Sequence, residues 1–159
     1  MSNINKAMEP SNIPHLLTAA QIAALPETVT THHLNSKAVR HTKAIGEVLG
    51  LKNLGIHLVR VEPGHDSTQY HLHYREEEFL YILSGRGIAE IGDQEIEVAE
   101  GDFMAFTAPS LPHSLKNPFD EDLVYLMGGE RHDTEVVDYV RLKKRQFRLH
   151  QDRQLVDLE

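Results

Sequence analysis

Short apolar runs, separated by glycine, proline and aspartate, dominate the chain from about Lys37 onward. Apolar residues alternate with glycine and histidine at the start of residues 54–61, and this run leads into a Pro63–Gly64 turn. Such alternation is expected of a strand with one buried face. Gly92 and Asp93 separate two further runs, and glycine supplies the positive backbone torsion that a tight hairpin requires. Because such runs recur at intervals of about 8 to 12 residues, the sequence predicts an all-β sandwich or barrel.

The first 36 residues lack this pattern and predict an N-terminal arm. Thr18 begins a sequence typical of a capping box, and Pro26 would end the short helix that follows. A chain of 159 residues suits one domain with a single core. We therefore expect three parts: an arm over residues 1–36, a barrel over residues 37–130 and an extension over residues 131–159.

Composition excludes several classes of protein. The chain has no cysteine, which rules out disulfides, thiolate metal sites and cysteine nucleophiles. A formal net charge of -8 argues against nucleic-acid binding, which normally needs a basic surface. No apolar run approaches the roughly 20 residues of a membrane span, and residues 1–10 lack the apolar core of a signal peptide. We expect a cytoplasmic protein with neither nucleic acid nor membrane as a partner.

A basic run near the C-terminus, residues 141–148, is the exception to this acidic balance. It could bind phosphate, but we favour a solvated helix face or a tail that docks on a partner subunit. The arm and this tail could both cross to a neighbouring chain, and closed two-fold dimers are the commonest oligomers. The sequence therefore predicts a homodimer.

Three histidines and one glutamate have the spacing of a metal site. In a strand, side chains two residues apart point to the same face, so His71 and His73 would present two imidazoles side by side. Glu78 begins an apolar run that reads as the neighbouring strand, and His113 follows much later. Three imidazoles and one carboxylate would leave room for water or substrate on a divalent first-row ion. A His-x-His pair alone is often structural, and Glu77 is the alternative carboxylate ligand.

These residues resemble the two motifs of the cupin superfamily. The first motif would comprise Gly64, His71, His73, Glu78 and Gly85, and the second Gly101, Pro109, His113 and Asn117. The chain departs from the second motif between Gly101 and His113, where Leu111–Pro112 replaces the usual internal glycine. The resemblance covers residues 38–130 and implies a double-stranded β-helix, or jelly-roll, barrel.

The resemblance implies a metal-binding cupin with one divalent transition metal, either Fe, Mn, Zn or Ni. We expect a metal-dependent enzyme of the dioxygenase, decarboxylase or isomerase type that acts on a small, polar and anionic metabolite. The alternative is a cupin that binds or senses a small molecule without catalysis. Some oxalate-converting cupins carry an arginine where this chain has Thr68, which makes oxalate chemistry a poorer match.

Alternation also predicts which side chains face the barrel interior. Glu78, Leu80 and Ile82 should face inward, and Phe79 and Tyr81 outward. His57 or Arg60 could supply a polar group to the interior, but not both, because they lie three residues apart. For Glu76 the sequence indicates a solvated turn. Asn117 is expected either to form a turn or to support a ligand histidine, and Arg131 either to pair with Glu130 or to reach an anionic ligand.

Overall fold

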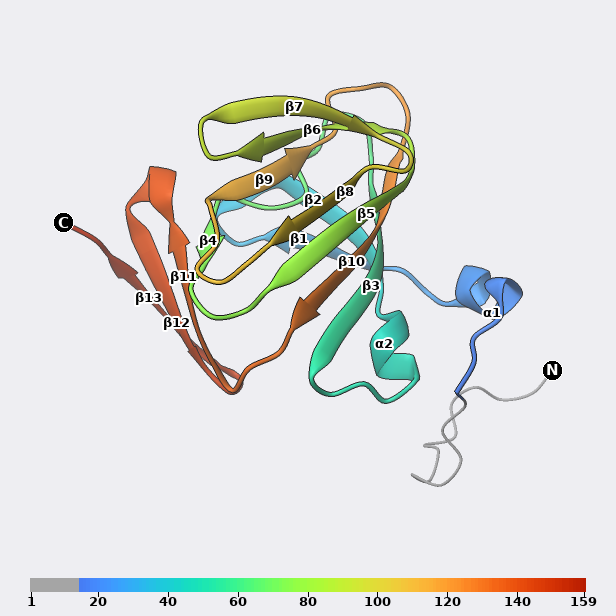
Figure 1. Cartoon of the computed structure of the whole chain (residues 1–159), viewed down its shortest axis with the longest axis horizontal. Helices are drawn as coiled ribbons and strands as arrows, with labels where there is room; N and C mark the ends of the chain where they lie inside the picture. Colours follow the sequence, from blue (N-terminus) through green and yellow to red (C-terminus); the bar gives the residue numbers. More distant parts are fainter. Residues whose placement is uncertain (1–14) are drawn as a thin grey trace.

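The computed structural model describes residues 15–159, so the first part of the predicted arm lies outside the described residues. Its fold is mostly antiparallel β-structure, as predicted (Figure 1). The elements are α1 (Ala19–Ala24), β1 (Thr28–His32), β2 (Asn35–Lys43), α2 (Ile45–Val48), β3 (Leu54–Val61), β4 (Leu72–His73), β5 (Glu78–Ser84), β6 (Arg86–Ile91), β7 (Gln94–Ala99), β8 (Phe103–Phe106), β9 (His113–Lys116), β10 (Leu123–Glu130), β11 (Thr134–Tyr139), η2 (Val140–Leu142), β12 (Lys144–Leu149) and β13 (Asp152–Asp157). None of the helices in this part of the chain is long and apolar enough to span a bilayer.

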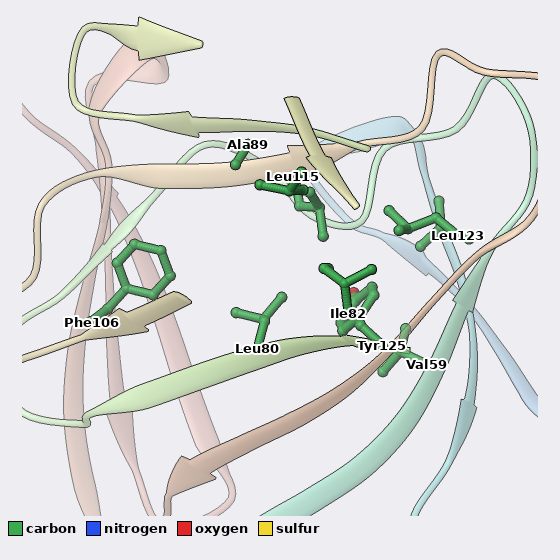
Figure 2. Packing of buried hydrophobic residues seen from close by; sticks show 10 residues of the cluster. Val59, Leu80, Ile82, Ala89, Phe106, Leu115, Leu123 and Tyr125 are labelled. Atoms are coloured by element: carbon green, nitrogen blue, oxygen red, sulfur yellow. The ribbon is translucent and has the colours of Figure 1, made fainter. Parts of the chain in front are cut away.

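Two sheets enclose the core of the barrel. One has the strand order β1-β2-β3-β10-β5-β8, and the other has the order β7-β6-β9. In Figure 2, Ala89 and Leu115 of the smaller sheet lie opposite Leu80, Ile82 and Tyr125 of the larger one. These side chains are 8 % exposed or less, so burial of apolar surface between the two sheets stabilises the barrel.

The predicted alternation along β5 is confirmed. Leu80 and Ile82 are buried in the core, whereas Tyr81 is 40 % exposed and Phe79 packs against Phe103 of β8. The same alternation along β3 decides between its two polar candidates. His57 shares the inward face with the buried Val59 and Val61.

Arg60 faces away from the barrel interior. Its guanidinium pairs with Glu27, Glu62 and Asp122 on the outer side of the large sheet. The interior of the barrel therefore receives its polar group on β3 from His57 and not from Arg60.

The capping box at Thr18 is present, and α1 follows it as predicted. The β-structure, however, begins at Thr28 and not near Lys37. Strand β1 forms the edge of the six-stranded sheet by pairing with β2, which in turn pairs with β3. Its sequence Thr-Val-Thr-Thr-His has no apolar alternation, because most of its side chains are exposed at a sheet edge.

The prediction of a helix face in the basic C-terminal run was wrong. Most of this run forms β12, which lies in a third sheet with the order β13-β12-β11-β4 beside the barrel (Figure 1). Arg145 pairs with Asp138 of β11, and Arg148 pairs with Glu76. Local sequence gave no sign of these pairs, because Asp138 lies in another strand and Glu76 lies in the segment between β4 and β5.

Candidate metal centre

Separate strands bring the four predicted ligands to one end of the barrel. His73 lies in β4, Glu78 begins β5 and His113 begins β9. His71 precedes β4 and forms an antiparallel bridge with His113. Strand β11 pairs with β4 directly behind His73. The cluster therefore lies where the barrel meets the C-terminal sheet.

The ligand atoms of His71, His73 and Glu78 converge closely enough for one ion. The Nε2 atoms of His71 and His73 are 3.0 Å apart, and Glu78 Oε1 lies 3.9 Å and 3.8 Å from them. Two ligands bound at about 2.1 Å from one metal can be at most about 4.2 Å apart, so all three distances fit a shared ion. His113 Nε2 contacts the same Glu78 oxygen. The structure brings the four predicted side chains together, and their ligation of a metal stays a prediction.

Hydrogen bonds orient two of the imidazoles for metal binding. His71 Nδ1 lies 2.8 Å from the carbonyl oxygen of Gln69, and His113 Nδ1 lies 2.8 Å from that of Leu111. Because a carbonyl only accepts, Nδ1 carries the proton in both rings. The neutral His71 ring therefore keeps a lone pair on Nε2, which points into the cluster. His113 Nε2 donates to Glu78 in the metal-free protein, and it would give up this proton when it binds a metal.

The electrostatics of the cluster favour the forms that bind metals. Burial would raise the pKa of Glu78, but the hydrogen bond from His113 and the nearby histidines lower this pKa to about 2. Burial, together with the neighbouring His73, lowers the pKa of His71 to about 3. At neutral pH the site thus offers an ionised carboxylate and a neutral imidazole.

The alternative carboxylate, Glu77, does not join the cluster. Its side chain is exposed, and its backbone amide donates to Glu130 Oε2 at 3.0 Å.

The prediction of a solvated turn was wrong for Glu76, which is 6 % exposed, pairs with Arg148 and accepts from the amide of His132. Both partners are distant in sequence, so the acidic run alone could not reveal the burial.

Asn117 forms a turn and does not contact the histidines. Its Nδ2 donates to the carbonyl oxygens of Val61 at 2.9 Å and Glu121 at 2.7 Å, and its Oδ1 accepts from the amide of Phe119. Of the two expectations for this residue, the structure supports the turn.

The sequence did not single out Glu135, a buried carboxylate behind the cluster. It is 1 % exposed, and its Oε2 lies 3.7 Å from His73 Nδ1. One signal was available: Glu135 alternates with the buried Val137 and Tyr139, so it occupies an inward position of β11.

A cavity of about 750 Å³ adjoins the cluster. This volume is typical of sites for small ligands. Its wall includes threonine hydroxyls of β1 and β2, namely those of Thr28, Thr30 and Thr42. The cluster is therefore open to a space in which a small polar molecule fits.

Arg40 and His57 add two polar groups to the same cavity wall. Arg40 is partly buried on the inward face of β2, and among residues 15–159 no carboxylate oxygen lies within 4.0 Å of its guanidinium. Burial and the charge of Arg40 lower the pKa of His57, so this imidazole is neutral at pH 7.

Arg131 lies at the mouth of the cavity. Its guanidinium pairs with Glu47 of α2 and lies 3.3 Å from His57 Nε2. It does not pair with Glu130, which was one of the two expectations from the sequence. Glu130 pairs with His132 instead. Arg131 thus joins α2 to the inward histidine of β3.

Comparisons with known proteins agree with this architecture. A family model described as "Cupin domain" matches residues 57–129. The crystal structure of a putative sugar phosphate isomerase from Acidithiobacillus ferrooxidans is 43% identical, with a TM-score of 0.87 over 89% of this chain and 91% of that one. A sugar phosphate isomerase from a cupin superfamily, from Silicibacter pomeroyi, is 26% identical, with a TM-score of 0.75 over 84% of this chain and 86% of that one.

A curated relative is similar over a shorter stretch. An uncharacterized protein of Methanocaldococcus jannaschii is 37% identical over 57 residues, which are 36% of this chain. The match spans 45% of that relative, less than half of its length.

Proposed function

This chain belongs to the cupin superfamily, and from that premise we propose that it is a metal-dependent isomerase of a small phosphorylated sugar. Two structural relatives that align over most of the chain are described as sugar phosphate isomerases. The observation that carries the proposal is the cavity itself, which joins the four potential metal ligands to an interior arginine without a carboxylate partner among residues 15–159.

The donor set suits a divalent first-row metal. His71, His73, Glu78 and His113 would hold it, and a bound ion would polarise the carbonyl oxygen of the sugar and so acidify the adjacent C–H bond. Four protein ligands of mixed nitrogen and oxygen type leave room for substrate on an ion of higher coordination number. Iron, manganese, nickel and zinc all accept such ligands.

Arg40 supports a phosphorylated substrate. A buried cation is costly without a counter-charge, and a phosphate bound in the cavity would supply one. Guanidinium groups bind phosphate through two parallel hydrogen bonds. The threonine hydroxyls of the wall can donate to, and accept from, the hydroxyl groups of a sugar.

His57 is our candidate for the proton transfer. Isomerisation of an aldose to a ketose moves one proton from C2 to C1 and a second proton from the C2 hydroxyl to the oxygen on C1, so that the C=O bond moves from C1 to C2. A neutral imidazole can take the carbon-bound proton and return it, so the reaction consumes no oxidant. The two structural relatives described as sugar phosphate isomerases favour isomerisation over dioxygenation or decarboxylation.

Solvent deuterium exchange tests the proposal. We would incubate the metal-loaded protein in D₂O with a panel of aldose and ketose phosphates and with the unphosphorylated sugars. The expected result is interconversion of one phosphorylated pair, with deuterium incorporated at the carbon next to the carbonyl. Binding of phosphorylated sugars without interconversion or exchange would replace the isomerase by the alternative of a non-catalytic binding cupin.

Two variants assign the roles of the cavity residues. Arg40→Met should raise KM for the phosphorylated sugar by at least about tenfold, since it removes one charged hydrogen-bonding partner of the phosphate. His57→Gln should abolish deuterium exchange while it retains binding. Arg86→Met is the matched control, because Arg86 is an exposed arginine paired with Glu97 and Glu121 outside the cavity.

A further inference from the structure

We propose that Glu135 is a positioning residue of the metal centre, whose carboxylate orients His73 and accepts the Nδ1 proton of that ring when Nε2 binds a metal. The inference rests on the metal binding proposed above. Glu135 lies in β11, outside residues 57–129 that match the family model. The C-terminal sheet would thus supply a working part of the metal site, in addition to covering one end of the barrel.

His73 differs from the other two histidines in the environment of Nδ1. In His71 and His113 this nitrogen donates to a backbone carbonyl. Nδ1 of His73 is buried and has no hydrogen-bond partner among the described residues. It faces Oε2 of Glu135 at 3.7 Å. A shift of the ring by about 0.8 Å would bring this pair to an ordinary N–H···O distance of about 2.9 Å.

The carboxylate of Glu135 is clamped to the segment that carries His73. Oε1 accepts from the amides of Arg75 at 3.1 Å and Val136 at 2.6 Å, and Oε2 accepts from the amide of Glu76 at 2.6 Å. Arg75 and Glu76 lie two and three residues after His73 in the chain. The oxygen that faces the imidazole is therefore held in place by the backbone next to that imidazole.

The charge of Glu135 also points to His73. The side chain is fully buried, yet no lysine or arginine nitrogen lies within 4.0 Å of it in the part of the chain that the structure describes. A buried carboxylate needs both hydrogen bonds and a nearby positive charge. A metal-bound imidazole that donates from Nδ1 supplies that charge, and the carboxylate in turn makes the ring a stronger ligand.

A second metal site behind His73 is a poorer explanation of the same residues. His73, Glu76 and Glu135 place one ligand atom each within 4.8 Å of one another. The guanidinium of Arg148, however, already contacts Glu76 Oε1. With this cation paired to Glu76, Glu135 supports the histidine and does not itself bind an ion.

Zinc binding by two matched variants tests the proposal. Glu135→Gln removes the charge while it keeps the size of the side chain, and Asp138→Asn does the same to another buried carboxylate of β11, which contacts Tyr74 and Arg145. By chelator competition, we expect Glu135→Gln to lower the affinity for Zn²⁺ about 10- to 100-fold and Asp138→Asn to leave it within about twofold. Circular dichroism establishes that both variants are folded.

The Nδ1 proton of His73 provides a readout that a purely structural role would not change. In Zn²⁺-loaded wild-type protein with ¹⁵N-labelled histidine, Nε2 of His73 would bind the metal, and the Nδ1 proton should resonate strongly downfield because it donates to a carboxylate. In Glu135→Gln this resonance should move upfield, whereas Asp138→Asn should leave it in place. If Glu135→Gln does not fold, the wild-type spectrum still decides, because a His73 Nδ1 proton that exchanges with water too fast to be observed overturns the proposal.

The outcomes separate this inference from the proposed function. Wild-type protein that binds no Zn²⁺ and no other divalent first-row ion would overturn the metal-dependent function. Wild-type binding together with an unchanged affinity in Glu135→Gln would overturn the role of Glu135 alone.

Discussion

His71 and His113 are hydrogen-bonded to each other through both of their backbone amides, although they lie far apart in the sequence. The amide of His71 donates to the carbonyl of His113 at 3.1 Å, and the amide of His113 donates back at 2.7 Å. The ring of Phe106 stacks on the His113 imidazole at 3.7 Å. Two of the proposed ligands are therefore positioned by the backbone and by core packing.

Replacement of His73 tests the ligand set directly. We expect wild-type protein to bind one divalent ion per chain and His73→Ala to lose at least about tenfold in affinity, because one of four ligands is missing. Metal content after dialysis, measured by inductively coupled plasma mass spectrometry, checks this. His15→Ala is the control, since His15 is exposed and lies before α1. Equal metal content in His73→Ala and wild type would contradict the assignment.

The turn at Gly85 should be intolerant of any side chain. Gly85 has φ of +78°, and a Cβ there would lie 2.2 Å from the backbone oxygen of Asp122. Gly92 also has a positive φ, +57°, but a Cβ there would have no heavy atom within 4 Å. Gly92→Ala should therefore cost about 1 to 2 kcal/mol of backbone strain, and Gly85→Ala should cost more because the clash adds to it.

Urea unfolding of the two alanine variants measures the difference. Both substitutions add one methyl group at a left-handed position, so the comparison isolates the contact with Asp122. Equal free energies of unfolding would show that the strand end at Gly85 can move away from that backbone, contrary to our expectation.

The barrel could be anticipated because strand signals are local, and the convergence of the four predicted ligands because their spacing resembles the two cupin motifs. Alternation along residues 54–61 and 78–84 identifies strands and their inward faces, and the spacing of His71 and His73 places both on one face. Glu76 and Glu135 could not be assigned in this way. Their burial depends on contacts with β12 and with the segment after β4, which only the folded chain brings together.

Two other expectations depended on patterns that did not determine structure. A run of basic residues is compatible with a helix face or a strand, and the pairing of Arg145 with Asp138 selects the strand. The threonines of β1 gave no apolar period, although they place hydroxyl groups in the cavity wall.

The homodimer stays a prediction, which light scattering checks by a mass of twice 18.0 kDa.

Asp138 should make stability depend on acid pH. Hydrogen bonds from Arg145 and Tyr74 outweigh burial and lower the pKa of this carboxyl below its ordinary value of 3.8. Because the folded pKa lies below the unfolded one, the stabilisation is present above about pH 4 and is lost as the pH falls through the folded pKa. Asp138→Asn should be less stable than wild type at pH 7, and the difference should shrink towards pH 3.

Unfolding by urea at several pH values between 3 and 7 measures this difference. Asp120→Asn is the control, since Asp120 is exposed in the turn before β10. A wild-type advantage over Asp138→Asn that stayed constant across this range would show that the carboxylate's ionisation does not stabilise the fold.

Asn117 should stabilise the barrel without affecting metal binding. Its side chain is 1 % exposed and makes three hydrogen bonds to backbone groups around the turn. Asn117→Ala leaves these groups unpaired and should cost about 1 to 3 kcal/mol. Asn117→Asp should cost at least as much at pH 7, because a carboxylate oxygen would replace the amide nitrogen that faces the carbonyls of Val61 and Glu121.

Thermal unfolding and chelator competition together check this prediction. Both Asn117 variants should unfold at lower temperature than wild type, while the folded fraction keeps the wild-type affinity for Zn²⁺. Asn53→Asp, an exposed position before β3, should leave both quantities unchanged. A loss of zinc affinity in folded Asn117→Ala comparable to that of His73→Ala would mean that the turn also positions His113, since His113 begins β9 and Asn117 directly follows that strand.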